Sequence, residues 1–308
     1  MSAIVNAVLP LFALIFLGYV GARRSLFGSA AVDSLNKFVV WMALPALLFQ
    51  AMAQIKLQDI NQPGFVIAFI VSTTAVFLTS CVLDRHRKRR LADISIEGMA
   101  AGYANAGFMG IPLVLILFGD AALPPAIIIT LLTACGLFAW SIVLIEFDLQ
   151  ASPSLARTLF KVAMSLLRNP LVVAPVLGLA LAIAGIELPY AVLQFTTLLG
   201  SAASPCALVT IGLFLARSQP SSQHGPIWRI VALKLVLHPL LTAVLVYWVF
   251  DMPRMWADTA VLLSALPVGT GPFMLATLYQ RDAAISSRAI LISTVLSMIT
   301  VSVLVILL

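Results

Sequence analysis

The sequence contains ten stretches that are long and apolar enough to cross a lipid bilayer as helices. A membrane-spanning helix needs about 20 mostly apolar residues. Of the 308 residues, 62% are hydrophobic and 10% are charged, which is more apolar surface than a water-soluble core can bury. The chain is therefore predicted to be an all-α integral membrane protein with ten transmembrane helices. These are residues 3–20, 35–54, 64–83, 94–118, 124–147, 170–186, 191–216, 227–250, 257–279 and 285–308.

The basic residues fall in alternate connections between these segments. Lysine and arginine accumulate in cytoplasmic loops, so both termini are predicted to lie outside. The first segment is interpreted as a retained span, not a signal peptide. The basic run 85–90 is predicted to be a cytoplasmic loop near lipid headgroups, and not a nucleic-acid patch. Residues in the predicted inner loops account for 15 of the 18 basic residues: Arg23, Arg24, Lys37, Arg85, Arg87, Lys88, Arg89, Arg90, Arg157, Lys161, Arg168, Arg217, Arg229, Arg281 and Arg288.

Prolines and glycines repeat at an offset of 160 residues. The matching pairs are Pro10 and Pro170, Gly18 and Gly178, Pro45 and Pro205, and Pro112 and Pro272. Five spans is an odd number, so the second copy must enter the membrane from the opposite side. This predicts two inverted five-helix repeats, 1–147 and 168–308, joined by a cytoplasmic linker at 148–167.

The fourth and ninth segments are interrupted at equivalent places. Residues 105–112 read Asn-Ala-Gly-Phe-Met-Gly-Ile-Pro, and residues 267–272 read Pro-Val-Gly-Thr-Gly-Pro. Proline removes a backbone donor, so the fourth helix is predicted to break near Gly110 to Pro112; a packed proline kink is the alternative. Two broken helices are predicted to meet near the bilayer midplane, where their N-terminal ends favour an anion.

The polar residues near the breaks can each be interpreted in two ways. Asn105 is interpreted either as a substrate contact or as a helix cap. The Thr270 hydroxyl either faces a substrate or bonds its own backbone. Gly269 and Gly271 are predicted to allow close approach and unusual backbone angles.

Lys234 and His238 lie four residues apart in the eighth segment, on one helical face. Lys234 is expected to snorkel to the inner surface. The alternatives are a counter-charge for an anionic substrate and a cation that substitutes for a bound ion. For His238, a hydrogen-bonded structural role is weighed against proton coupling with Lys234.

No enzyme site can be assembled from the chain. The cysteines, Cys81, Cys135 and Cys206, show no metal-ligand spacing, and no nucleotide motif is present. Acidic residues fall near segment ends, so no carboxylate relay is visible. No metal, cofactor or nucleic-acid partner is predicted.

The two interrupted motifs resemble the crossover motifs of the auxin efflux carrier family, which includes plant PIN auxin exporters and bacterial malonate and malate carriers. The first motif continues to Leu113, and the second spans 266–273. The stretches 168–170 and 211–215 are similar to the family's sixth and seventh helices. The resemblance covers essentially the whole chain.

The resemblance implies a scaffold of helices one, two, six and seven, often the dimer interface, and a transport part that moves like an elevator. The resemblance also implies that Asn105 contacts a substrate carboxylate and that Pro112 and Pro272 mark the point where the two broken helices cross. The plant exporters have charged residues on the third helix, whereas residues 71–75 here carry none. That departure weakens the expectation of indole-3-acetate as substrate.

The sequence thus predicts a secondary transporter of small organic anions, such as malonate, malate or auxin-like acids, with the lipid bilayer and a possible second copy as partners. A sodium-coupled bile-acid-type symporter and a non-transporting anion sensor are the alternatives. The candidate substrate-binding residues are Asn105, Gly110, Ile111, Pro112, Lys234, His238, Pro267, Gly269, Thr270, Gly271 and Pro272.

Overall fold

The computed structural model describes residues 2–28, 30–55, 61–84, 89–149, 160, 162–164, 166–218 and 221–308. These residues form helices joined by turns, with one isolated antiparallel bridge between Ala104 and Val268. The all-helical prediction is confirmed. The basic residues 85–88 and most of the predicted linker, 150–159 with 161 and 165, lie outside the described residues.

Among the described residues, six helical stretches are long and apolar enough to cross a membrane: Ala31–Ala53, Pro63–Asp84, Asp120–Leu149, Tyr190–Leu215, His224–Val249 and Ala284–Leu307. Val8–Arg23, Ala106–Phe118 and Pro170–Ile183 are shorter apolar helices. Large apolar side chains on these stretches are exposed, such as Phe195 at 64% and Trp248 at 76%. Apolar surface of this kind is stable when lipid surrounds it. A count of ten spans stays a prediction.

The chain divides into two compact units, each assembled from several separate segments. Unit 1 comprises residues 1–63, 107–128 and 166–217, and unit 2 comprises residues 64–106, 129–165 and 218–308. Each unit therefore draws on both predicted repeats.

In unit 1, two pairs of helices pack closely. The elements are α1 (Ser2–Arg23), α2 (Ala31–Phe38), α3 (Leu44–Ala53), α7 (Ile111–Phe118), α11 (Pro170–Ile183), α12 (Tyr190–Ser201) and α13 (Ala203–Leu215). Helix α1 packs on α13, and α3 packs on α11 and α12. The Thr196 hydroxyl of α12 donates to Gln50 of α3 over 2.8 Å.

Glycines let both helix pairs approach closely, as is common within membranes. A Cβ atom built at Gly18 would lie 2.2 Å from the carbonyl oxygen of Val209, and one at Gly178 would lie 2.3 Å from that of Phe49. Gly178 follows Gly18 by 160 residues, and Phe49 precedes Val209 by 160. One contact is thus the counterpart of the other under the offset found in the sequence.

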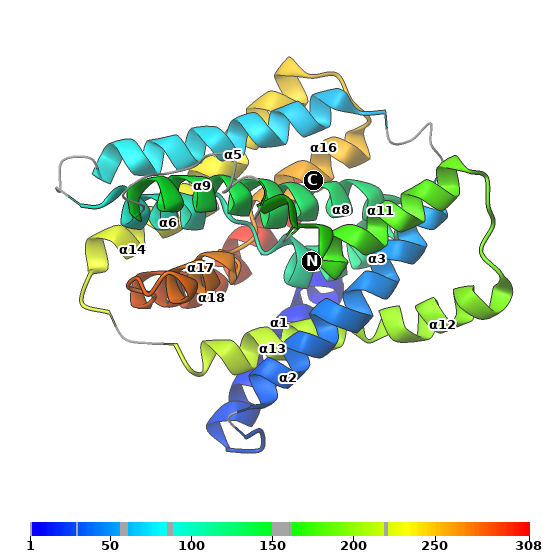
Figure 1. The fold of residues 1–308 in the computed structure, drawn as a ribbon, viewed down its shortest axis with the longest axis horizontal. Coiled ribbons are helices and arrows are strands. Elements are labelled where there is room, and N and C mark those ends of the chain that lie inside the picture. The colour runs from blue at the N-terminus through cyan, green and yellow to red at the C-terminus, as the bar shows by residue number, and fades with distance from the viewer. Residues whose placement is uncertain are drawn as a thin grey trace. The chain divides into compact units, whose positions relative to one another are not determined.

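Unit 2 contains the long helix α5 and the chain segments around both breaks (Figure 1). Its elements are α5 (Pro63–Asp84), α6 (Leu91–Gly102), α9 (Phe138–Leu149), α14 (His224–Ala232), α15 (His238–Val244), α16 (Arg254–Ser264), α17 (Gly271–Leu278) and α18 (Ala284–Leu307). Wider π-helical turns at Leu132–Leu137, Leu233–Leu237 and Leu245–Val249 join helices within a continuous stretch. Helix α8 (Leu123–Leu131) crosses the boundary between the units.

Candidate functional site

Within unit 2, the two helix breaks lie side by side as short extended segments. The Asn105 N–H donates to the Pro267 carbonyl over 3.0 Å, and the Gly269 N–H donates to the Tyr103 carbonyl over 3.0 Å. The Val268 N–H donates to the Ser293 hydroxyl of α18 over 3.0 Å. Each break therefore satisfies some of the backbone groups that the other leaves unpaired. Backbone N–H and C=O groups inside a membrane need such partners, because lipid offers none.

The first break does not lie where the sequence predicted it. Helix α6 ends at Gly102, the extended segment is 103–105, and helical structure resumes at Ala106 with a π-turn, Ala106–Gly110. Pro112 therefore lies inside helix, in the first turn of α7. The wider π-turn accommodates the missing backbone donor, so the proline does not end the helix. The second break is placed as predicted, with Pro272 in the first turn of α17.

Gly269 and Gly271 allow the Tyr103 ring to lie against the second break. A Cβ atom would lie 2.9 Å from the Tyr103 ring at Gly269, and 2.4 Å from its Cζ atom at Gly271. The expected close approach is confirmed. The expected unusual backbone angles are wrong, because neither glycine has a positive φ. Sequence reasoning overlooked Tyr103, although an aromatic residue two positions before Asn105 was a visible signal.

The side chains of Asn105 and Thr270 make no hydrogen bond within the described part of the chain. Asn105 is buried at 7% exposure, and no group in the described part of the chain hydrogen-bonds its carboxamide. Thr270 is half-buried and precedes α17 without a side-chain cap bond. The alternatives of a cap for Asn105 and a self-bonded hydroxyl for Thr270 are therefore not what the structure shows.

The predicted site residues divide between the units. Asn105, Pro267 and Gly269 are brought together in unit 2, along with Thr270, Gly271 and Pro272. Gly110, Ile111 and Pro112 belong to unit 1, where all three are buried.

Lys234 and His238 form a buried polar cluster in unit 2, and both are 0% exposed. The Lys234 Nζ lies 3.1 Å from the His238 Nδ1 and donates to the Ser264 carbonyl at the end of α16. The His238 Nε2 lies 3.2 Å from the Thr73 hydroxyl of α5. The prediction that Lys234 snorkels is therefore wrong, because the helix end at Ser264 offers its ammonium a partner inside the protein.

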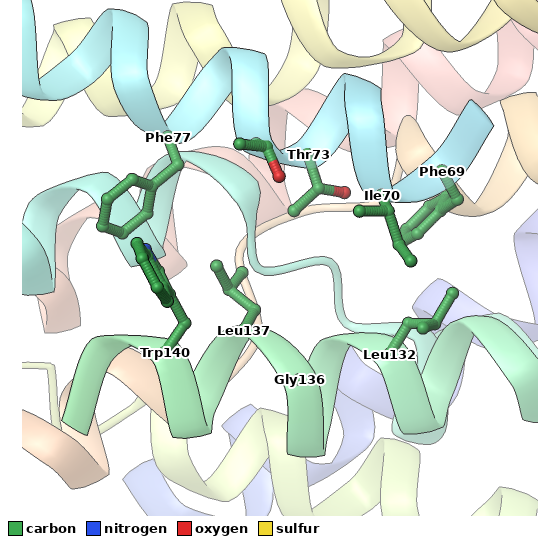
Figure 2. Close-up of a pocket in the computed structure, with 9 residues that line it drawn as sticks. Phe69, Ile70, Thr73, Phe77, Leu132, Gly136, Leu137 and Trp140 are labelled. Atoms are coloured by element: carbon green, nitrogen blue, oxygen red, sulfur yellow. The ribbon is translucent and has the colours of Figure 1, made fainter. Parts of the chain in front are cut away.

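An apolar pocket of about 410 Å³ lies between α5 and the stretch Leu132–Leu149 (Figure 2). Three aromatic side chains line it, Phe69, Phe77 and Trp140, together with Thr73. A Cβ atom at Gly102, the last residue before the first break, would lie 3.1 Å from the Thr73 Cγ2. The pocket wall thus contacts both the break and the Lys234 cluster through one residue.

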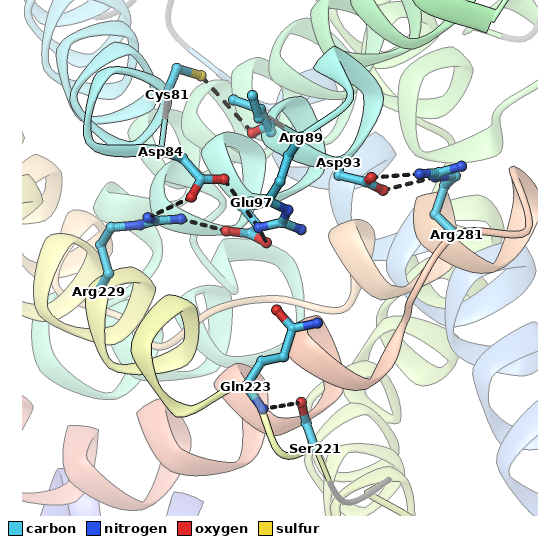
Figure 3. Close-up of polar contacts among 10 residues, drawn as sticks. Cys81, Asp84, Arg89, Asp93, Glu97, Ser221, Gln223, Arg229 and Arg281 are labelled. Carbon is cyan, nitrogen blue, oxygen red and sulfur yellow. Dashed lines mark hydrogen bonds and ion pairs between the residues drawn. The ribbon is translucent and has the colours of Figure 1, made fainter. Parts of the chain in front are cut away.

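A ring of four charged side chains joins α5, α6 and α14 (Figure 3). Arg229 bonds Asp84 over 3.0 Å and Glu97 over 2.5 Å, while Arg89 bonds Asp84 over 3.0 Å and also contacts Glu97. Burial lowers the pKa of Arg89, but the carboxylates of Glu97 and Asp84 outweigh it and hold that pKa above its ordinary value. Sequence reasoning treated Arg89 and Arg229 as loop charges and missed this ring.

A separate ion pair, Arg281 with Asp93, lies beside this ring (Figure 3). The Arg281 guanidinium bonds both oxygens of Asp93, with an Nε–Oδ1 distance of 2.8 Å. The hydrogen bond to Asp93 raises the pKa of Arg281 above its ordinary value.

The model of a family described as membrane transport proteins matches residues 3–305. The chain belongs to this family of membrane transporters, the auxin efflux carrier family. It is a multi-pass membrane protein, as its apolar helices indicate.

Relatives from distant organisms match nearly the whole chain. A Rhizobium meliloti protein provisionally named a malonate transporter is 31% identical over 98% of this chain and 95% of its own length. Auxin efflux carrier component 8 of Arabidopsis thaliana is 23% identical over 96% of this chain and 95% of its own length. The lysosomal cholesterol signaling protein of Mus musculus is 24% identical over 94% of this chain but only 36% of its own length.

Proposed function

We propose that the protein is a secondary transporter of small organic anions that binds its substrate at the paired helix breaks. The observation that carries this proposal is the antiparallel contact between the two breaks, with the buried Asn105 carboxamide beside it. Irregular backbone at membrane depth is stable where it lines a site that a ligand or water can reach.

The chemistry of the breaks suits a carboxylate. The first N–H groups of a helix lack intrahelical partners, and a helix N-terminus carries roughly half a positive charge. Helix α17 starts at Gly271, directly after the second break. Asn105 adds two amide donors, so one carboxylate can be bound by side-chain and backbone groups together. Lys234 bonds the Ser264 carbonyl just before the second break and adds a positive charge to the same unit.

We further propose that the chain is built from two inverted repeats, 1–147 and 168–308, and that transport is an elevator-like movement of unit 2, to which both repeats contribute. The matched contacts of Gly18 and Gly178 in unit 1 support the repeats. The division into units supports a scaffold built from α1, α2, α3, α11, α12 and α13, against which unit 2 carries the anion. The scaffold helices also provide the surface for a possible homodimer. Both termini lie outside the bacterial inner membrane in this proposal, as the basic loops indicate.

The substrate class includes dicarboxylates and acids with an apolar body. The name of the Rhizobium meliloti relative supports malonate as the first anion to test. The aromatic pocket beside Thr73 instead suits the ring of an auxin-like acid, since no charged residue lines it.

Two alternatives make different predictions. A sodium-coupled symporter would need sodium for flux. A non-transporting anion sensor would bind an anion without moving it. The mouse relative is named a signaling protein, which is a reason to test this alternative.

The test is flux of labelled malonate, malate and indole-3-acetate into proteoliposomes, with membrane potential and pH gradient set independently. Saturable, potential-sensitive flux of one anion supports the proposal. Binding without flux would favour the sensor, and neither binding nor flux of any anion by folded protein would contradict the proposed function.

The site is tested with Asn105→Ala. Loss of one hydrogen bond to a charged group costs about 1.5–3 kcal/mol, which weakens substrate affinity about tenfold or more. Asn61→Ala is the matched control, because Asn61 is an exposed asparagine outside the helices. Normal affinity and flux for Asn105→Ala would show that the site assignment is wrong.

A further inference from the structure

The buried ammonium of Lys234 has no carboxylate partner in the described part of the chain. The ion pairs of the described residues in unit 2 involve Arg89, Arg229, Arg254 and Arg281. Lys234 is instead 0% exposed and bonds a backbone carbonyl and a histidine nitrogen. A buried lysine without a carboxylate needs another source of negative potential.

That source is the C-terminal end of α16. The last carbonyl groups of a helix carry roughly half a negative charge and lack intrahelical donors. Lys234 donates to the carbonyl of Ser264, the last residue of α16, and the second break follows directly. The ammonium therefore neutralises the carbonyl end of one half-helix, while the opposite end of the break begins α17.

The protonation state of Lys234 determines which groups of this cluster donate. With Lys234 as an ammonium, which only donates, His238 accepts at Nδ1 and carries its proton at Nε2. The His238 Nε2–H then donates to the Thr73 hydroxyl. His238 is neutral in this arrangement, and the cluster carries a single positive charge.

We propose that Lys234 is a resident cation, which occupies the place at the second break where other transporters of this design hold an inorganic cation. Helix C-terminal ends at broken helices coordinate sodium or protons in many secondary transporters. Because Lys234 is covalently attached, transport needs no inorganic cation at this break. This inference rests on the proposed anion transport and deepens it by assigning how the break is neutralised.

The first test uses the wild-type protein. Anion flux at fixed membrane potential and fixed pH gradient is measured in sodium, potassium and N-methylglucamine media. Equal flux in all three is the expected result. A flux that requires sodium or potassium would overturn the inference.

The second test replaces the cation chemically. Lys234→Ala removes the atoms of an n-propylammonium ion and leaves a cavity of that shape. We expect flux to fall at least about tenfold, as for loss of a charged hydrogen bond, and n-propylammonium to restore it. Lys234→Met fills the same space with an apolar chain, so the amine should not restore that variant. Lys37→Ala, at an exposed lysine of α2, is the control that neither loses flux nor responds.

A measurement without transport separates this inference from the proposed function. In detergent and without anion, n-propylammonium should raise the midpoint of thermal unfolding of Lys234→Ala and leave wild type unchanged. That outcome supports the resident cation even if no tested anion moves. A folded Lys234→Ala protein that transports normally, or that n-propylammonium neither stabilises nor restores, would overturn it.

Discussion

Two charged clusters in unit 2 are built on opposite principles. In the ring of Asp84, Arg89, Glu97 and Arg229, every charge meets an opposite charge, and the ring ties α5 and α6 to α14. In the Lys234 cluster, one cation is held by a helix end and a neutral histidine. A balanced ring can fasten helix ends without serving a ligand. An unbalanced cation beside a helix break leaves positive potential for an anion.

The largest expected effect comes from unbalancing the ring. Glu97→Gln removes one carboxylate that is 2% exposed and leaves Arg229 partly unpaired. Breaking a buried charge pair costs about 3–5 kcal/mol, so the midpoint of thermal unfolding in detergent should fall strongly.

The double variant Glu97→Gln with Arg229→Met should recover part of that loss, since it removes the unpaired charge as well. Asp251→Asn, at an exposed carboxylate, should leave the unfolding midpoint unchanged. A Glu97→Gln protein as stable as wild type would show that the ring does not hold the helices.

The next effect concerns the contact between the breaks. Gly271→Ala drives a methyl group into the Tyr103 ring and should cost about 1–3 kcal/mol of folding free energy. Anion affinity should fall with it, because the second break must move. Gly136→Ala is the matched control for the unfolding midpoint alone, since a Cβ atom there meets nothing within 4 Å but Gly136 lines the aromatic pocket. Equal unfolding midpoints for the two variants would contradict the close packing.

Lys234→Met removes the charge of the second cluster. It leaves the Ser264 carbonyl without its donor but also removes a buried charge, so we expect a stability loss of only about 1 kcal/mol. Flux should nevertheless fall further than in Glu97→Gln. The measurement is flux per folded molecule for both variants. The reverse order would mean that the ring, not the Lys234 cluster, serves transport.

The smallest effect is expected at the partly exposed pair of Arg281 and Asp93. Their side chains are 24% and 19% exposed, and such pairs contribute at most about 1 kcal/mol. Arg281→Ala should lower the unfolding midpoint slightly, and added salt should reduce the difference from wild type. A loss as large as that of Glu97→Gln would place this pair with the ring.

Local sequence predicted the elements better than their contacts. Apolar length and the proline–glycine motifs indicated the helices and both interruptions. The prediction placed the first break too close to Pro112, because a proline can remain inside a helix when a π-turn precedes it.

The charged residues were harder to interpret, because their partners are distant in sequence. Lys234 meets Ser264 thirty residues later, and Arg229 meets Glu97 across 132 residues. Composition alone placed the first at the membrane surface and the second in a loop. Only the packing of α5, α6, α14 and α16 supplies these partners.

The proposed function requires an organic anion to bind at the paired breaks beside Asn105. Equilibrium binding of labelled malonate and indole-3-acetate to purified protein tests this requirement, with Asn105→Ala and Asn61→Ala measured side by side. We predict saturable binding of at least one anion by wild type and Asn61→Ala, and about tenfold or weaker affinity for Asn105→Ala. Equal affinity for all three proteins would contradict the account.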